Sequence, residues 1–183
     1  MPFLSPEDLV RLYESPGPAG DPPPLHDLCQ MEWSSATHAH GAATDVPGLL
    51  RALISDDALH REFAAQLLFE TIWHQGDIYE ATPLAVPFLY NLLEADGPHD
   101  KEVIAFLLCC IAEGQPPYGA KFEGDSPEAK MWRSLLSRKG MDPDAVLANE
   151  RRFMNELRRQ LDARSHLLIP YRSKFASANR VEG

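Results

Sequence analysis

Two short segments between predicted helices contain the side chains best suited to chemistry. His38 and His40 stand two residues apart in the first, and His74, Asp77 and Glu80 stand in the second. Imidazole and carboxylate groups bind zinc and other first-row metals, and a metal-bound water would act as a hydrolytic nucleophile at neutral pH. The candidate metal ligands are therefore His38, His40 and His74, although the sequence has no His-Glu-x-x-His motif.

The cysteines give no recognisable catalytic arrangement. Cys29, Cys109 and Cys110 are an odd number, and the adjacent pair is poorly placed to form a disulfide. On a helix, one of the two adjacent thiols should face the core, where unpaired cysteine is usually inert. The sequence also lacks a Gly-x-Ser-x-Gly elbow and a phosphate-binding loop. We expect no catalytic residue and no cofactor.

The charge of the chain favours a basic partner. Its 183 residues include 17 Lys and Arg against 27 Asp and Glu, a net charge of −10. Residues 1–149 have a net charge of −14, whereas residues 150–183 have a net charge of +4. Nucleic-acid binding is disfavoured because it relies on many cationic contacts to phosphate. The arginines after residue 150 alternate with acids at helical spacing, which favours pairing within one helix.

The chain contains an internal repeat. Residues 31–72 align without gaps to residues 71–112, at an offset of 40 residues. The identical positions are Trp33/Trp73, Val46/Val86, Pro47/Pro87, Leu49/Leu89, Leu53/Leu93, Asp56/Asp96, Glu62/Glu102, Ala65/Ala105, Leu67/Leu107 and Leu68/Leu108. Self-similarity at this period indicates a helical repeat. The matching positions of the two tryptophans favour packing at the unit boundaries.

Each repeat unit contains two predicted amphipathic helices joined by a short polar turn. These turns are Ser55-Asp56-Asp57 and Ala95-Asp96-Gly97-Pro98, and their aspartate side chains can cap the following helix. Ser126-Pro127 and Asp142-Pro143 begin two further helices, the second of them long, which supply a third unit. Helix pairs bury their apolar faces by stacking, and about three are needed for stability. The predicted fold is all-α, a short α-α superhelix of about three antiparallel helix pairs.

The first helix of each unit contains a proline, and a basic residue begins the second helix. The residues of this pattern are Val46, Pro47, Leu49, Asp56 and Arg61, then Val86, Pro87, Leu89, Asp96 and Lys101. The pattern resembles HEAT repeats over residues 31–112. The resemblance implies a scaffold that binds partners, although some HEAT-like proteins are lyases acting on bilin chromophores. An internal proline should also kink each first helix, at Pro47 and at Pro87.

The connection between the two units is the predicted binding site. Residues 73–82 resemble the inter-repeat segment of uncharacterised bacterial HEAT-like proteins, a group that supplies no reaction. We expect Gly76 to end the preceding helix. Aromatic and charged residues often anchor protein partners when exposed. The predicted partner-binding residues are Trp73, His74, Gln75, Asp77, Tyr79, Glu80 and the neighbouring Glu70.

The ends of the chain differ in composition from the repeats. Residues 1–24 should form a helix starting at Ser5-Pro6 and then a proline-rich arm. Residues 25–165 should form the repeat domain, beginning with a helix from Leu25 to about Trp33. Residues 166–183 should form a tail, frayed after about Pro170.

The function that these features favour is non-catalytic. We expect a cytoplasmic protein-protein interaction module that binds a basic protein partner, for example an inhibitor or immunity-like protein that blocks a basic toxin or nuclease. The alternative is a metal-dependent enzyme or a lyase-like HEAT protein that uses the histidines of the inter-repeat loops. No apolar stretch approaches the length of a membrane span, so we expect no membrane association.

Overall fold

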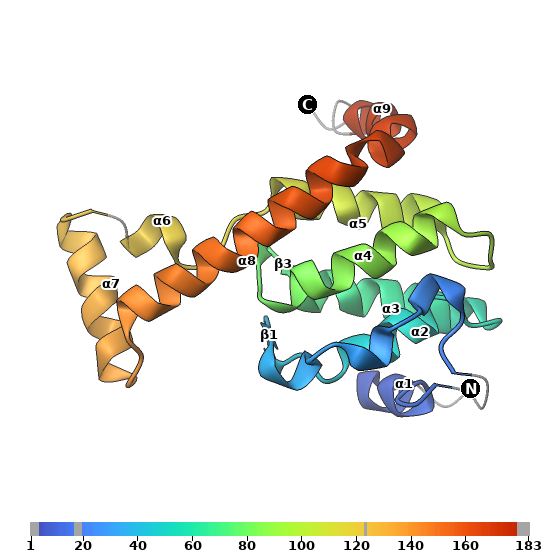
Figure 1. Ribbon diagram of the computed structural model, residues 1–183, viewed down its shortest axis with the longest axis horizontal. Coiled ribbons are helices and arrows are strands. Elements are labelled where there is room, and N and C mark those ends of the chain that lie inside the picture. The colour runs from blue at the N-terminus through green and yellow to red at the C-terminus, as the bar shows by residue number, and fades with distance from the viewer. Residues whose placement is uncertain (1–3, 17–19, 123, 179–183) are drawn as a thin grey trace.

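The computed structural model describes residues 4–16, 20–122 and 124–178 (Figure 1). The fold is all-α, as predicted, with two very small sheets. The α-helices are α1 (Pro6–Leu12), α2 (Val46–Ala52), α3 (Ala58–Thr71), α4 (Ala81–Glu94), α5 (Lys101–Glu113), α6 (Gly119–Phe122), α7 (Pro127–Arg138), α8 (Pro143–Arg164) and α9 (Ile169–Ala178). The 3-10 helices are η1 (Pro23–Leu25), η2 (Leu28–Gln30), η3 (Trp33–Ser35) and η4 (Ser165–Leu168). The strands are β1 (Thr37–His38), β2 (Gly41–Ala42), β3 (Trp73–His74) and β4 (Asp77–Ile78).

The two repeat units form two stacked helix pairs. Helix α2 packs on α3 and α4 packs on α5, while α2 also packs on α4 and α3 on α5. Asp57 and Asp100 cap α3 and α5 by accepting hydrogen bonds from backbone N–H groups of the first turn. Equivalent helices of the repeat therefore lie side by side, in agreement with the offset of 40 residues in the sequence.

Helix α4 is the centre of this packing. Ten of its fourteen residues are buried, and it contacts α2, α5, α8 and η1. A helix that is apolar on nearly every side is stable only when it is covered on nearly every side. The elements around α4 satisfy this requirement together.

The two prolines of the repeat occupy different positions in their helices. Pro87 lies inside α4, as predicted. Pro47 lies in the first turn of α2, because that helix begins at Val46. Proline is tolerated in a first turn, where its missing N–H would have no helical acceptor. The predicted kink at Pro47 is therefore wrong.

The N-terminal segment joins the same core. Ser5 caps α1 as predicted, and Leu9 of this helix is fully buried. The expected helix from Leu25 to Trp33 is wrong, because 3-10 turns η1 to η3 occupy this region. The left-handed conformation of Asp27, with φ of 66°, interrupts a regular helix here.

A buried ion pair fastens the segment after α1 to helix α2. The Nε atom of Arg51 lies 2.6 Å from Oδ1 of Asp21, and both side chains are buried. The same guanidinium donates to the backbone carbonyls of Tyr13 and Glu14. Because these bonds satisfy a buried charge, the end of α1 and Asp21 are held against α2.

The third predicted helix pair is arranged differently from the first two. Ser126 and Asp142 cap α7 and α8 as predicted. However, α8 runs back along α4, while α6 and α7 stand away from the repeat pairs (Figure 1). Phe122, Leu136 and Leu147 form a small second core between α6, α7 and α8. Helix α8 thus covers the stack, as its length suggested, and also carries α7.

The C-terminal segment is more regular than predicted. Helix α9 continues the chain through residue 178, where we expected fraying after about Pro170, and it packs against α5. Phe175 of α9 lies 5.1 Å from Phe106 of α5, measured between ring centroids. This aromatic contact supplies apolar packing for a helix that has little other amphipathic character. The end of the predicted tail, residues 179–183, lies outside the described residues.

The arginines of α8 mostly form ion pairs and hydrogen bonds. Arg159 makes hydrogen bonds of 2.7 and 2.8 Å to the carboxylate of Glu156, which confirms the predicted pairing within the helix. Arg164 donates to Asn91 of α4 at 2.8 Å. Within the part of the chain that the structure describes, no helix is both long and apolar enough to cross a membrane.

Glu150 points from α8 into the protein. Its side chain is buried, and its Oε1 atom accepts a hydrogen bond of 2.9 Å from the backbone N–H of Tyr118. Burial raises the pKa of the Glu150 carboxyl, and hydrogen bonds from the backbone of Tyr118 and Gly119 only partly oppose this increase. The folded protein therefore holds this proton at a higher pH than the unfolded chain does.

This raised pKa predicts a specific pH dependence. Stability from the protonated Glu150 is complete below its unfolded pKa and is lost as pH rises through the folded pKa. Glu150→Gln cannot ionise, so from pH ~4 to pH ~7 its free energy of unfolding should rise relative to that of the wild type, which loses the contribution of the protonated carboxyl. Urea denaturation at both pH values checks this difference. An identical pH dependence in the two proteins would contradict it.

Candidate functional site

The two connections singled out in the sequence form β-hairpins. Strand β1 pairs with β2, and β3 pairs with β4, in both cases antiparallel and with a two-residue turn. In the second hairpin both turn residues have positive φ, 53° at Gln75 and 93° at Gly76. This combination is the one that a two-residue turn between twisted strands favours. Gly76 therefore closes a hairpin, and the prediction that it ends a helix is wrong.

The two hairpins lie next to each other. The backbone N–H of Ala39 donates to the carbonyl of Thr71, the last residue of α3, at 3.1 Å. The rings of His40 and His74 lie 5.4 Å apart between centroids. The expectation that equivalent connections lie side by side is therefore correct for this pair of histidines.

His38 is not available as a metal ligand, although its ring lies 6.0 Å from that of His40 between centroids. Its side chain is buried, and its Nε2 atom lies 2.8 Å from Oδ1 of Asp45. Its Nδ1 atom lies 3.0 Å from the backbone nitrogen of His40 and accepts that N–H. With Nδ1 as an acceptor, Nε2 is the donor to Asp45. Both ring nitrogens are thus used inside the first hairpin, which fixes the turn that carries His40.

Glu80 also has an internal role. Its Oε2 atom accepts from the backbone N–H of Thr37 at 3.0 Å and from the Thr37 hydroxyl at 2.8 Å. Its Oε1 atom accepts from the side-chain amide of Asn149 on α8. One carboxylate therefore joins the first hairpin, the start of α4 and helix α8.

Asp77 and Tyr79 are half-buried parts of the second hairpin and its exit. Asp77 pairs with His74 across the hairpin and bridges to Gln115. The backbone N–H of Tyr79 donates to the hydroxyl of Thr82, which itself donates to the carbonyl of Ile72 at 2.5 Å. Burial, and then the nearby Asp77 charge, raise the pKa of the Tyr79 hydroxyl. These contacts hold the chain between α3 and α4.

Trp73 belongs to a row of aromatic side chains that crosses the outer face of the repeat. Its ring packs edge-on against Phe69 at 6.1 Å, and Phe69 lies 5.7 Å from Phe106. Trp33 is buried and donates from Nε1 to the Leu28 carbonyl at 2.9 Å. Trp33 is therefore a core residue, as its repeat position predicted, whereas Trp73 is half-buried and packs against the core from its edge. Gln75, at the tip of the second hairpin, is exposed.

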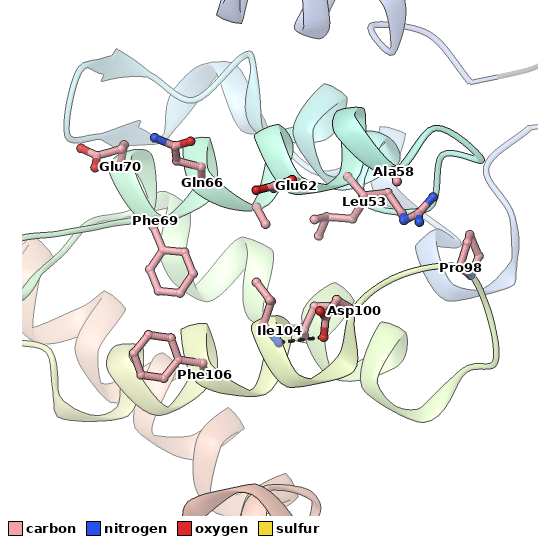
Figure 2. A pocket seen from close by; sticks show the side chains of 13 residues that line it. Leu53, Ala58, Glu62, Gln66, Phe69, Glu70, Pro98, Asp100, Ile104 and Phe106 are labelled. Atoms are coloured by element: carbon pink, nitrogen blue, oxygen red, sulfur yellow. Dashed lines mark hydrogen bonds between the residues drawn. The ribbon is translucent and has the colours of Figure 1, made fainter. Parts of the chain in front are cut away.

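A groove between α3 and α5 begins beside this hairpin. Figure 2 shows Phe69 of α3 and Phe106 of α5 facing each other across it. The groove has a volume of about 800 Å³. Apolar side chains make up most of its lining: Leu53, Ala58, Ala65, Phe69, Pro98, Val103, Ile104 and Phe106. Phe106 is 45% exposed, a large value for an aromatic side chain.

The polar residues of this groove lie mainly on one edge. Glu62, Gln66 and Glu70 follow one another at four-residue spacing along α3, and all three are exposed. The guanidinium of Arg61 is bonded to the backbone carbonyls of Ser55 and Asp56. Glu62 and Glu70 outnumber Arg61 along α3, so this edge of the groove has a net negative charge.

Of the residues that line this groove, the sequence had indicated only Glu70 as a binding residue. The spacing of Glu62, Gln66 and Glu70 beside Phe69 was readable as one helix face. The exposure of Phe106 was not readable, because it depends on where α7 and α9 lie. Phe175 of α9 contacts this side chain, while α7 lies away from the repeat pairs (Figure 1).

The thiols give no sign of activation. All three cysteines are unpaired, with Cys29 exposed and Cys109 and Cys110 half-buried. Burial raises the pKa of both adjacent thiols, which disfavours the nucleophilic thiolate. This agrees with the interpretation of the adjacent cysteines as packing residues.

In comparisons with known proteins, the chain matches no family model, no curated protein and no solved structure. The HEAT resemblance therefore remains a prediction from the repeat pattern.

The contacts of Glu80 predict a loss of stability when this side chain is removed. Glu80→Ala leaves the Thr37 hydroxyl and the Asn149 amide without their acceptor, so the free energy of unfolding should fall by about 1–3 kcal/mol. The matched control Glu32→Ala, at an exposed site, should change it by less than about 0.5 kcal/mol. Urea denaturation followed by circular dichroism measures both. Equal effects of the two substitutions would contradict this role of Glu80.

Proposed function

We propose that this protein binds a basic protein partner in the groove between α3 and α5. The partner would insert apolar side chains between the two helices and place Lys or Arg beside Glu62 and Glu70. The observation that carries the proposal is the exposed Phe106 in an apolar groove with an acidic edge. Of the predicted partner-binding residues, the proposal retains Glu70. It adds Phe106 and Glu62 to the binding site.

The size of the groove supports a peptide-like segment as the occupant. A volume of about 800 Å³ is within the range of small-ligand pockets and accommodates several side chains of one segment. Hydrophobic grooves between helices commonly receive one apolar face of an amphipathic helix. Phe69 and Phe106 supply aromatic contact area, and aromatic residues provide much of the binding energy at protein interfaces.

The charges support a basic occupant. Glu62 and Glu70 lie two turns apart on α3 and both are exposed, so cations on a bound helix can reach them at a similar spacing. Residues 1–149 have a net charge of −14, which adds long-range attraction for a cationic partner. Attraction of this kind increases the association rate and selects against acidic partners.

The remaining predicted partner-binding residues belong to the hairpin connection that follows α3 and contacts Phe69 through Trp73. Gln75 and His74 belong to the hairpin beside Phe69 and can contact the end of a bound segment. Trp73, Asp77, Tyr79 and Glu80 support that hairpin through the contacts described above. An inhibitor or immunity-like role is one form of this proposal, in which the partner is a basic toxin or nuclease.

Selection of peptides from a random display library, followed by fluorescence anisotropy, tests the proposal. The selected peptides should combine apolar residues with Lys or Arg. Phe106→Ser should weaken their binding by about tenfold or more, because it removes the exposed aromatic contact. Glu62→Gln should weaken binding at low salt and have a smaller effect at high salt.

The matched control is Met131→Ser, which removes an exposed apolar side chain on α7, away from the groove. It should leave peptide affinity unchanged. The proposal is wrong if Phe106→Ser binds the peptides as tightly as the wild type, or if selection yields no basic, apolar sequences.

A further inference from the structure

We infer that His40, Glu70 and His74 form a binding site for a divalent first-row metal ion, with Zn²⁺ as the ion that fits best. One potential ligand atom from each of these side chains lies within 4.8 Å of the other two. The cluster differs from the set expected from the sequence, because Glu70 takes the place of His38.

The distances permit coordination after small side-chain movements. Ligand atoms around a tetrahedral zinc ion lie about 3.3 Å apart when each bond is about 2.0–2.1 Å long. The Nδ1 atom of His74 already lies 3.2 Å from Oε2 of Glu70. His40 and Glu70 are exposed, so their side chains can rotate to close the remaining separation.

The backbone that presents these ligands is held by contacts on both sides. The buried His38 side chain accepts the N–H of His40 and bonds to Asp45, which fixes the first turn. The bond from Ala39 to Thr71 ties this turn to the end of α3, next to Glu70. Little chain ordering would therefore accompany metal binding, and that favours affinity. His38 is a positioning residue in this arrangement.

The ligand set selects among metal ions. Two imidazoles and one carboxylate match zinc and its first-row neighbours, whereas Ca²⁺ and Mg²⁺ prefer sites made of oxygen ligands. Three protein ligands leave a fourth position for water, as in zinc sites that remain open to solvent. The site shares Glu70 with the proposed partner groove, but its test is separate, because zinc titration of the free protein also depends on His40 and His74, which do not line the groove.

Isothermal titration of the full chain with Zn²⁺, after treatment with a chelator, tests the site. The wild type should bind one zinc ion, and His40→Ala or His74→Ala should weaken binding by at least about tenfold. Two controls, His166→Ala and Cys29→Ser, change an exposed histidine and an exposed thiol outside the cluster and should bind zinc as the wild type does.

Cobalt provides a second measurement that reports geometry. Four-coordinate Co²⁺ absorbs visible light more strongly than octahedral, hydrated Co²⁺. The wild type should show this stronger absorption on binding Co²⁺, and His74→Ala should lose it. Circular dichroism of each variant verifies that it is folded. Absence of zinc binding by the wild type, or wild-type affinity in both His40→Ala and His74→Ala, would overturn the inference.

Discussion

The burial of helix α4 is the constraint on which the rest of the structure depends. Residues such as Val86, Phe88 and Leu89 point in different directions around this helix and are all buried. Burying a side chain of this kind contributes about 1.5–3 kcal/mol, so leaving one side of α4 open would be costly. Helices α2, α5 and α8 together with η1 supply the cover. This requirement fixes α2/α3 against α4/α5 and brings α8 back across them.

The arrangement around α4 explains where the polar features lie. Pairing the two units side by side brings both inter-repeat hairpins together, so that His40 approaches His74. It also leaves the outer helices α3 and α5 as a face with a groove between them, where Phe69 and Phe106 meet (Figure 2). The later helices lie elsewhere, because α8 covers α4 and α9 packs against α5. The histidine cluster and the groove share Glu70, which lies at the end of α3.

Much of the fold was predictable because it depends on local chemistry. Ser5, Ser126 and Asp142 each precede a proline, and each caps the predicted helix. The repeat was readable because equivalent apolar positions must pack in equivalent ways. The hairpins were missed because two-residue strands show no periodicity, and only the turn at Gln75-Gly76 carries a signal.

The candidate site was less predictable, because several side chains serve distant contacts. Glu80 was expected at an interface, but it bonds to Thr37 and Asn149, which are far from it in sequence. His38 has the same chemistry as His40, yet Asp45 and the hairpin backbone use both of its ring nitrogens. Phe106 occupies an ordinary position in an apolar helix, and its exposure depends on the path of α7 and α9. Such distinctions arise from tertiary packing, which spacing in the sequence does not encode.

Hydrogen exchange with and without a bound basic peptide tests the central claim most directly. The account predicts that amides of α4 exchange slowest in the free protein, because this helix is enclosed. It predicts that the peptide slows exchange in residues 58–71 and 101–113, the helices that line the groove. Protection confined to α7 and the first turns of α8, with none in α3 or α5, would contradict it.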